Sequence, residues 1–189
     1  MEKIIYCLGD SNTYGYDPRS FFREAYDLPW PEQLGKLLSC GIYNDGVCGR
    51  TLREVLTSYD LLKQNLQDKS PALLILMLGS NDILMEDSLT GSQLSQRMEA
   101  LLSRLREDFP RLPVYLLSPP DIRIPGDFRQ RVQDTAAGFQ AVASRLEIDF
   151  LDLSSCSLPL GHDGVHLTEE GHGLLAWILS MELIKMSRG

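Results

Sequence analysis

Short apolar runs and longer amphipathic stretches alternate along the whole chain, and this alternation is the feature that most constrains the fold. Most of the runs are apolar throughout, without alternating polar residues, which is typical of parallel strands that are covered on both faces. The predicted strands are Ile4–Leu8, Gly41–Asn44, Ala72–Leu78, Val114–Ser118 and Ile148–Leu153.

The stretches between these runs carry apolar residues at the spacing of one helical face. They predict helices at Trp30–Ser39, 52–66, 94–109, Asp127–Leu146 and Glu169–Lys185. A chain in which strands and helices alternate forms a parallel sheet with right-handed crossovers. The sequence therefore predicts an α/β protein, a three-layer α/β/α sandwich around a five-stranded parallel sheet.

Length and composition are those of one globular unit. The 189 residues suit a single domain spanning 1–189, with 43% hydrophobic and 23% charged residues. The net charge of -8 weighs against nucleic acid as a partner, because binding phosphates requires a basic surface. No apolar stretch approaches the roughly 20 residues of a membrane span, and the N-terminal run is too short for a signal peptide. We therefore expect a cytoplasmic protein without membrane insertion; a homo-oligomer is compatible with the sequence.

Polar segments follow four of the predicted strands. Gly9–Asn12 follows the first strand, Asn44–Thr51 the second and Gly79–Asp82 the third, and Asp163–His166 lies a short loop beyond the fifth. Ligands of parallel α/β sheets bind beyond the carboxyl ends of the strands. We therefore expect these four segments to meet at one end of the sheet.

These segments contain the groups that acyl transfer requires. Ser11, at a strand-to-helix turn, can act as a nucleophile, with His166 taking its proton and Asp163 fixing the tautomer of the imidazole. The backbone N–H groups of Ser11 and Gly49 and the side-chain amide of Asn81 can form an oxyanion hole. This chemistry needs neither a metal nor a cofactor.

Plainer interpretations of the same residues exist. Ser11 could simply cap a helix. His162 and His172 compete with His166 for the role of base, and the three-residue spacing from Asp163 favours His166, because adjacent side chains usually point apart. A zinc site formed by His162, Asp163 and His166 lacks a nearby Cys or Glu to complete the ligand set and is disfavoured.

The motifs GDSNTYG, NDGVCGRT, GSND and DGVHLTEEGH resemble, in this order, the four blocks of the SGNH, or GDSL-type, lipases and esterases. The resemblance covers nearly the whole chain, from Gly9 to Gly171. Asn12 stands where the commonest form of the first block has leucine, at a position that varies in the family. The resemblance implies a flavodoxin-like SGNH hydrolase fold and metal-free ester hydrolysis by Ser11, His166 and Asp163.

The expected function is that of a serine hydrolase, a GDSL-type esterase or lipase that cleaves small-molecule carboxylic esters through an acyl-enzyme on Ser11. Short acyl groups, acetyl above all, are favoured because the chain has no obvious apolar lid. Within the family, a carbohydrate acetylesterase or an acyltransferase is an alternative. Outside it, the alternatives are a non-catalytic ligand-binding module and, disfavoured by the glycine spacing, a phosphate or nucleotide binder. The expected substrate contacts, on or near the long loop 15–29 or beyond the third strand, are Tyr14, Tyr16, Trp30 and Ile83.

Overall fold

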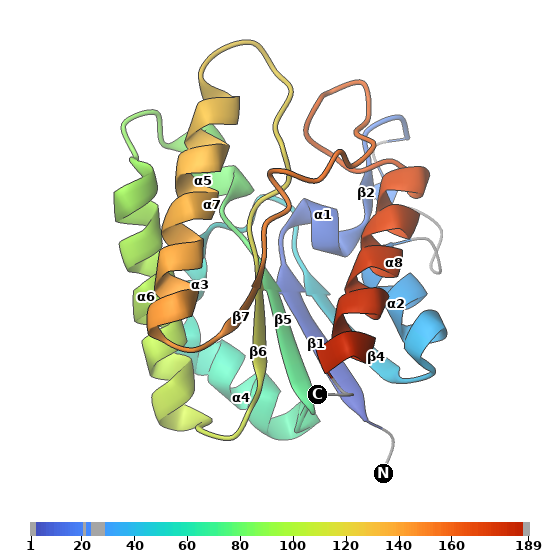
Figure 1. The fold of residues 1–189 in the computed structure, drawn as a ribbon, viewed down its shortest axis with the longest axis vertical. Coiled ribbons are helices and arrows are strands. Elements are labelled where there is room, and N and C mark those ends of the chain that lie inside the picture. The colour runs from blue at the N-terminus through green and yellow to red at the C-terminus, as the bar shows by residue number, and fades with distance from the viewer. Residues whose placement is uncertain (1–2, 21, 24–28, 187–189) are drawn as a thin grey trace.

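Five parallel strands form the central sheet of the structure, a computed structural model that describes residues 3–20, 22–23 and 29–186. Their order is β4-β1-β5-β6-β7, the flavodoxin-like order in which the first strand of the chain lies second in the sheet. The predicted α/β class and five-stranded parallel sheet are confirmed (Figure 1). The strands are β1 (Ile4–Gly9), β4 (Gly41–Gly46), β5 (Leu73–Met77), β6 (Val114–Leu117) and β7 (Asp149–Leu151).

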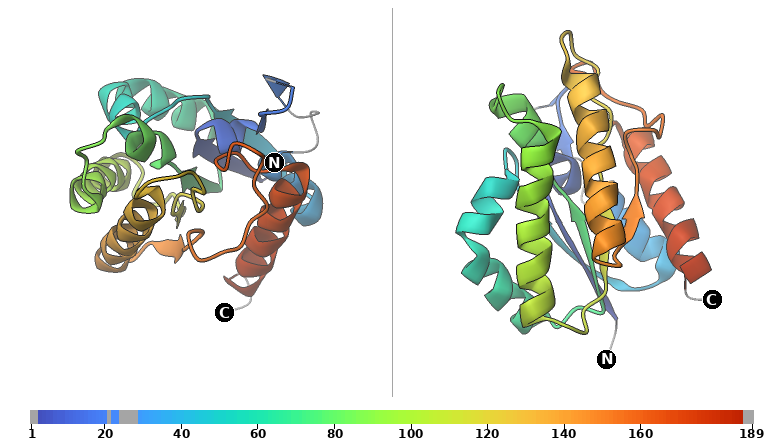
Figure 2. Two further views of the ribbon diagram at one scale, coloured as in Figure 1. Left: turned by 90° about the horizontal axis from the view of Figure 1, so that it is seen from above. Right: turned by 60° about the vertical axis from the view of Figure 1, so that its left-hand side comes forward.

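Helices cover both faces of this sheet and complete three layers (Figure 2). The helices that form the two outer layers are α2 (Trp30–Leu38), α3 (Leu52–Thr57), α4 (Tyr59–Lys69), α6 (Gly91–Asp108), α7 (Phe128–Arg145) and α8 (Glu169–Met186). Two short helices, α1 (Ser11–Tyr14) and α5 (Ser80–Met85), follow β1 and β5, and a small antiparallel ladder joins β2 (Tyr16–Asp17) to β3 (Phe22–Arg23). No helix within the described ranges has the length and apolar character needed to cross a membrane.

The central strands are buried on both sides, which explains their continuous apolar runs. Tyr6 and Leu8 of β1 pack into a core with residues of α3, α4, α6 and α7. Ile5 and Cys7 of the same strand pack into a second core with residues of α2 and α8. Successive side chains of a strand point to opposite faces, so a strand between two helical layers needs apolar residues at every position.

The single helix predicted at 52–66 is wrong, because the chain forms two helices there. Helix α3 ends at Thr57 and α4 begins at Tyr59. The hydroxyls of Thr57 and Ser58 donate to the carbonyls of Arg53 and Glu54, at 2.9 and 2.8 Å. Such bonds from Ser and Thr to the preceding turn bend helices, and here two occur in succession.

A buried histidine joins α8 to α2. His172 is fully buried, and its Nδ1 accepts the backbone N–H of Trp30, the first residue of α2, at 3.2 Å. Burial, helped by the charge of a protonated His166, lowers the pKa of His172 to about 4. The side chain is therefore neutral at pH 7 and acts as a helix cap supplied by another helix.

His172 should make the protein less stable in acid. Between pH 6.5 and about 4 the unfolded chain binds a proton at this residue that the folded chain does not, so the free energy of unfolding falls as the pH falls. This contribution amounts to about 3 kcal/mol. The His172→Gln variant lacks this pH-dependent contribution. The unfolding free energy of the wild type minus that of the variant should therefore be about 3 kcal/mol smaller at pH 4 than at pH 7. Urea unfolding at both pH values measures it, and a constant difference would contradict the assignment.

Candidate active site

Three of the four predicted site segments follow neighbouring strands. Ser11 begins α1 beyond β1, Gly49 lies in the loop after β4, and Asn81 lies in α5 beyond β5. Because β1 pairs in parallel with both β4 and β5, these segments lie side by side at the carboxyl end of the sheet. The connection from β7 to α8, orange in Figure 1, passes beside α1 and carries the fourth segment.

Two successive hydrogen bonds join Asp163, His166 and Ser11. Asp163 Oδ2 lies 2.6 Å from His166 Nδ1, and His166 Nε2 lies 2.9 Å from Ser11 Oγ. An imidazole that donates from Nδ1 to the carboxylate has a free lone pair on Nε2, which can accept the proton of the serine hydroxyl. Ser11 is only 7% exposed, whereas the side chains of His166 and Asp163 are 19% and 28% exposed. Ser11 is therefore mostly covered by the protein, while the other two side chains are partly exposed to solvent.

The loop around Asp163 holds this side chain as an anion. Its Oδ1 accepts the backbone N–H groups of Val165 and His166, at 3.0 and 3.1 Å. Burial alone would raise the pKa of Asp163, but the hydrogen bonds from the His166 ring and from these N–H groups outweigh burial and lower it. The carboxylate can therefore stabilise a positive charge on the imidazole at neutral pH.

Asn12 ties the His166 loop to the helix of Ser11. Its Nδ2 donates to the carbonyl of Val165 at 3.2 Å, and its Oδ1 accepts the N–H of Leu167 at 2.8 Å. Asn12 is 2% exposed, so the residues on both sides of His166 are held by one buried amide. Sequence reasoning missed this role; the asparagine in place of the usual leucine was the available signal.

Asn12→Ala should lower both stability and turnover. The buried N–H of Leu167 loses its acceptor, which costs about 1–3 kcal/mol of unfolding free energy. For the general-base role that the sequence predicts for His166, looser placement of this ring should lower kcat for a small ester by about ten- to a hundredfold, with little change in KM. Chemical unfolding and steady-state kinetics measure the two effects. If stability fell and kcat did not, Asn12 would be structural only.

A tight turn presents Gly49. The N–H of Arg50 donates to the carbonyl of Val47 at 3.1 Å, and the N–H of Val47 donates to the carbonyl of Gly9 at 3.2 Å, which ties the turn to the end of β1. Gly49 has a φ of +78°, and no atom lies within 4 Å of the place where a Cβ would be. The backbone conformation, and not a lack of space, therefore favours glycine here.

The Arg50 side chain anchors the same turn, a role that sequence reasoning missed. Its guanidinium donates to the carbonyl of Gly9 at 3.2 Å and to Asp45 Oδ1 at 2.8 Å, and also contacts the Asp45 carbonyl. Asp45 Oδ2 in turn accepts the hydroxyl of Tyr6 at 2.6 Å. The turn is thus fixed to both β1 and β4.

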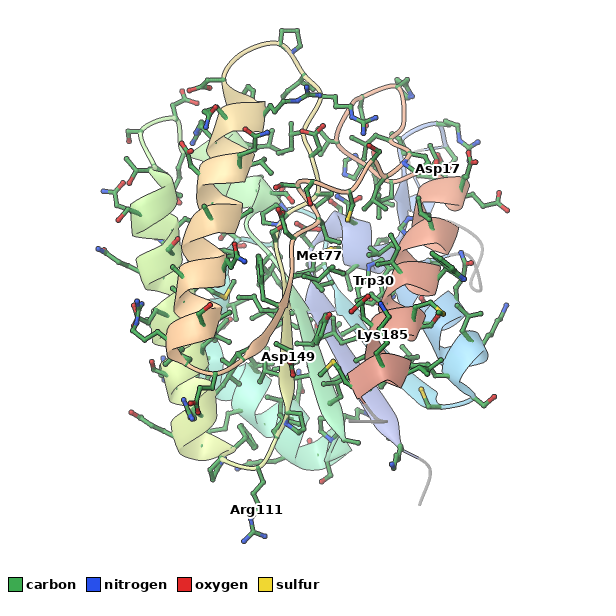
Figure 3. The ribbon with its side chains drawn as sticks, viewed as in Figure 1. Asp17, Trp30, Met77, Arg111, Asp149 and Lys185 are labelled. Atoms are coloured by element: carbon green, nitrogen blue, oxygen red, sulfur yellow. The ribbon has the colours of Figure 1, made fainter. Side chains whose placement is uncertain are left out.

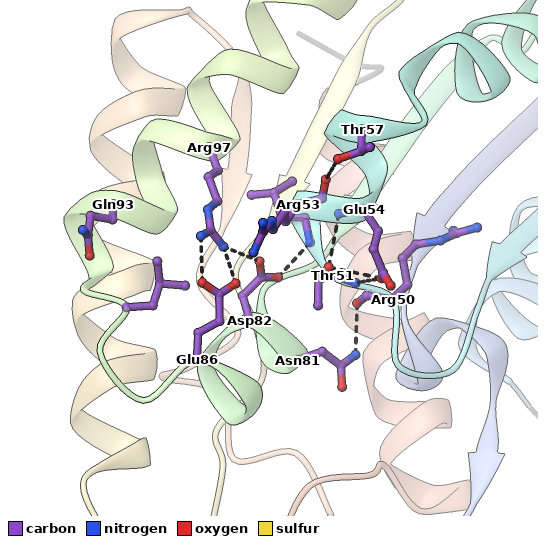
Figure 4. A network of polar contacts seen from close by, with 12 residues as sticks. Arg50, Thr51, Arg53, Glu54, Thr57, Asn81, Asp82, Glu86, Gln93 and Arg97 are labelled. Carbon is purple, nitrogen blue, oxygen red and sulfur yellow. Dashed lines mark hydrogen bonds and ion pairs between the residues drawn. The ribbon is translucent and has the colours of Figure 1, made fainter.

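Asn81 faces this turn, and a buried charged network fixes the helix that carries it (Figure 4). Asn81 Nδ2 donates to the carbonyl of Arg50 at 3.0 Å. The next residue, Asp82, is fully buried and accepts the N–H of Leu52 at 2.8 Å and a guanidinium N–H of Arg97 at 3.1 Å. Helix α5 is therefore held by both α3 and α6.

Three N–H groups of the site are able to donate a hydrogen bond to an anion. The backbone N–H groups of Ser11 and Gly49 donate no hydrogen bond within the described part of the chain. Ser11 is the first residue of α1, where the N–H has no partner inside the helix. Asn81 uses one amide hydrogen for Arg50, which leaves the second available.

A second carboxylate lies directly beside Ser11. Asp10 is 1% exposed, and its Oδ1 caps α1 by accepting the N–H of Asn12 at 2.9 Å. Burial raises the pKa of Asp10 to about 6, although this hydrogen bond and the charge of a protonated His166 oppose the shift. Asp10 is therefore mostly ionised at neutral pH and places a negative charge at the start of α1.

The sequence matches the model of the GDSL-like lipase/acylhydrolase family over residues 7–174. The chain belongs to this family. A search of curated protein sequences gave no match.

Solved structures support the same SGNH hydrolase fold for this GDSL-like chain. The native aryl esterase of M. smegmatis is 25% identical, with a TM-score of 0.81 over 97% of this chain and 99% of that chain. A carbohydrate acetylesterase family member from Sinorhizobium meliloti is 24% identical, with a TM-score of 0.80 over 97% and 98% of the two chains. Est24, a carbohydrate acetylesterase from the same organism, is 20% identical, with a TM-score of 0.83 over 98% and 100%.

The substrate contacts expected for this GDSL-like chain need correction. The ring of Tyr16 lies against that of His166, with centroids 4.7 Å apart, and Tyr14 is partly buried. The predictions for Trp30 and Ile83 were wrong, because these side chains are 0% and 2% exposed and pack in the two cores. Figure 3 shows Trp30 in the interior beside α8. Residues 21 and 24–28 of the expected pocket loop lie outside the described residues.

The other two histidines lie apart from the Ser11 hydroxyl. His162 is exposed, and the carboxylate next to it bonds to His166 instead. His172 is buried against α2, as described above. Among the residues that the structure describes, no three His, Cys, Asp or Glu side chains are grouped so that they could share a metal ion.

Proposed function

We propose that the protein hydrolyses carboxylic esters through an acyl-enzyme on Ser11, with His166 as general base and Asp163 as its partner. The observation that supports this proposal most directly is the pair of short contacts, 2.6 Å from Asp163 to His166 and 2.9 Å from His166 to Ser11. Membership of the GDSL-like lipase/acylhydrolase family supports the class of reaction.

In the proposed mechanism, His166 Nε2 takes the proton of Ser11 as Oγ attacks the ester carbonyl. The imidazolium, stabilised by Asp163, then donates this proton to the leaving alcohol, and the acyl group stays on Ser11. Water enters, gives a proton to His166 and attacks the acyl-enzyme. Collapse releases the acid and returns the proton to Ser11.

The oxyanion of each tetrahedral intermediate would accept hydrogen bonds from the N–H groups of Ser11 and Gly49 and from the Asn81 amide. Their free donor capacity supports this assignment. The carbonyl of Arg50 orients the amide of Asn81 before substrate arrives, so little reorganisation is needed during the reaction.

Asn81→Ala should lower kcat by about a hundredfold and leave KM nearly unchanged, because the lost bond forms mainly in the transition state. Steady-state hydrolysis of a chromogenic acetyl ester measures the effect. Gln130→Ala is the control, because this amide is exposed and donates to Asp134 on the surface of α7. Equal rates for the two variants would contradict the role of Asn81.

We propose short acyl groups, acetyl above all, as the preferred substrates, with the alcohol part of the ester in a groove beside Gly49. This groove has a volume of about 750 Å³ and is lined by the turn 47–50, by α3 and by Met85. Its lining mixes charged, hydroxyl and apolar side chains, which suits an aryl or sugar moiety better than a long acyl chain. The named neighbours, an aryl esterase and carbohydrate acetylesterases, agree with this choice.

Three kinds of experiment test the proposed function. A fluorophosphonate should label Ser11 in the wild type, and labelling should persist in Ser95→Ala, which removes a buried serine hydroxyl that donates to the carbonyl of Gly91. An unlabelled wild type would favour the non-catalytic binding module.

Rates for p-nitrophenyl esters of increasing acyl length should be highest for acetate; a maximum at long chains would contradict the acetyl preference. Fast hydrolysis of acetylated sugars would favour a carbohydrate acetylesterase. Transfer of the acyl group to an added alcohol, in place of water, would favour an acyltransferase.

A further inference from the structure

Helix α8 carries apolar side chains on all sides, although only one side is covered. Leu175, Ala176 and Leu179 are buried in the core beneath the helix. On the outer side, Leu174, Trp177 and Met181 are 37%, 56% and 41% exposed. A surface helix normally has a polar outer face, so an uncovered stripe of this kind marks an interaction site.

The ends of this stripe carry opposite charges. Leu174, Trp177 and Met181 have the i, i+3, i+7 spacing of one helical face. Glu170 lies four residues before Leu174 on the same face, and Lys185 lies four residues after Met181. Both charged residues are exposed. On the outer face of α8 an exposed acid, three apolar residues and an exposed base thus follow one another. Lys185, near the C-terminal end of the helix (Figure 3), also bonds to Glu182 of its own helix at 2.7 Å, so a carboxylate from another copy would join this ion pair.

We propose that a second copy of this chain covers the stripe, with the two α8 helices antiparallel about a two-fold axis. The stripe is complementary to itself in this arrangement only. An axis between Trp177 and Ile178 places Glu170 opposite Lys185 of the second copy, and Leu174 opposite Met181 of the second copy. A parallel arrangement would place like charges opposite one another.

Helix α2 extends the same surface. Gln33 Oε1 lies 3.4 Å from the place where a Cβ of Gly173 in α8 would be, and Leu37, one turn later on α2, is 52% exposed. Residues four apart share a helical face, so Leu37 adds apolar area beside the stripe. A face made of one helix and part of another is small for a stable interface, and we expect a dissociation constant on the order of micromolar.

Sedimentation velocity over a range of concentrations around this value tests the proposal. The wild type should shift from monomer to dimer as concentration rises. Trp177→Glu should weaken the dimer by about a hundredfold or more, because it places a charge at the centre of the interface. Leu61→Glu is the matched control: Leu61 is 61% exposed on α4, on the opposite side of the sheet, and this variant should dimerise like the wild type.

A charge exchange tests the antiparallel register. Glu170→Lys alone should weaken the dimer, and the double variant Glu170→Lys/Lys185→Glu should restore it. A wild type that stays monomeric throughout, or a dimer that survives Trp177→Glu, would overturn the proposal, and failure of the double exchange would overturn the register. Thermal unfolding and ester hydrolysis of each variant check that the fold is intact. Sedimentation does not depend on the proposed catalytic residues, so the dimer and the proposed function can fail independently.

Discussion

Ser11→Ala should abolish ester hydrolysis, with kcat for an acetyl ester lower by about a million-fold. The variant keeps the oxyanion donors and His166 but has no nucleophile to carry the acyl group. Asp10, and not Ser11, supplies the side-chain cap of α1, so the substitution should leave the helix and the fold intact. Hydrolysis of p-nitrophenyl acetate and thermal unfolding measure these two effects. Fluorophosphonate should no longer label the Ser11→Ala variant, which has no hydroxyl at this position.

The control for Ser11→Ala is Ser95→Ala, which removes a buried serine hydroxyl far along the chain and should keep wild-type kcat. A Ser11→Ala enzyme that turned over within tenfold of the wild type would show that Ser11 is not the nucleophile. Loss of activity together with a large loss of stability would leave labelling of the wild type to decide the role of Ser11.

The sheet was predictable because burial on both faces leaves a strong pattern in the sequence. Residues such as Ile5, Tyr6 and Cys7 must all be apolar or fit an apolar core, since successive side chains enter different cores. That the polar segments meet at one end of the sheet then followed from the rule that ligand sites lie beyond the carboxyl ends of parallel strands. Both inferences use only local sequence and general geometry.

Short helices and helix breaks were not predictable from periodicity. Helix α1 spans only Ser11–Tyr14, which is too short to show a repeat of 3.6 residues. The break at Ser58 depends on two hydroxyl groups that bond to their own helix, whereas the apolar spacing continues through it. A pattern of burial does not report such local hydrogen bonds.

The supporting residues of the site were missed because their partners lie far away in the sequence. Asn12 bonds to residues more than 150 positions later, and Arg50 bonds to the carbonyl of Gly9. For Trp30 and Ile83 the residue type led to a predicted substrate contact, although both side chains are buried in the cores. A large apolar side chain suits a core as well as a pocket. Only the packing distinguishes the two.

Asp163→Asn should lower kcat by about ten-thousandfold while the His166 loop keeps its shape. The asparagine oxygen can still accept the N–H groups of Val165 and His166, which hold Oδ1 of the aspartate in the wild type. Its amide nitrogen would then face His166 Nδ1 and require that atom to accept a hydrogen bond. The imidazole proton would move to Nε2, and a protonated Nε2 cannot take the proton of Ser11.

Asp163→Ala separates this tautomer effect from the loop itself. Alanine removes the acceptor for both backbone N–H groups, so this variant should lose stability as well as turnover, whereas Asp163→Asn should lose turnover with little change in thermal unfolding. Fluorophosphonate labelling should slow in both variants, since it also needs an activated serine. An Asp163→Asn enzyme with kcat within tenfold of the wild type would mean that the 2.6 Å contact to His166 serves the loop and not the reaction.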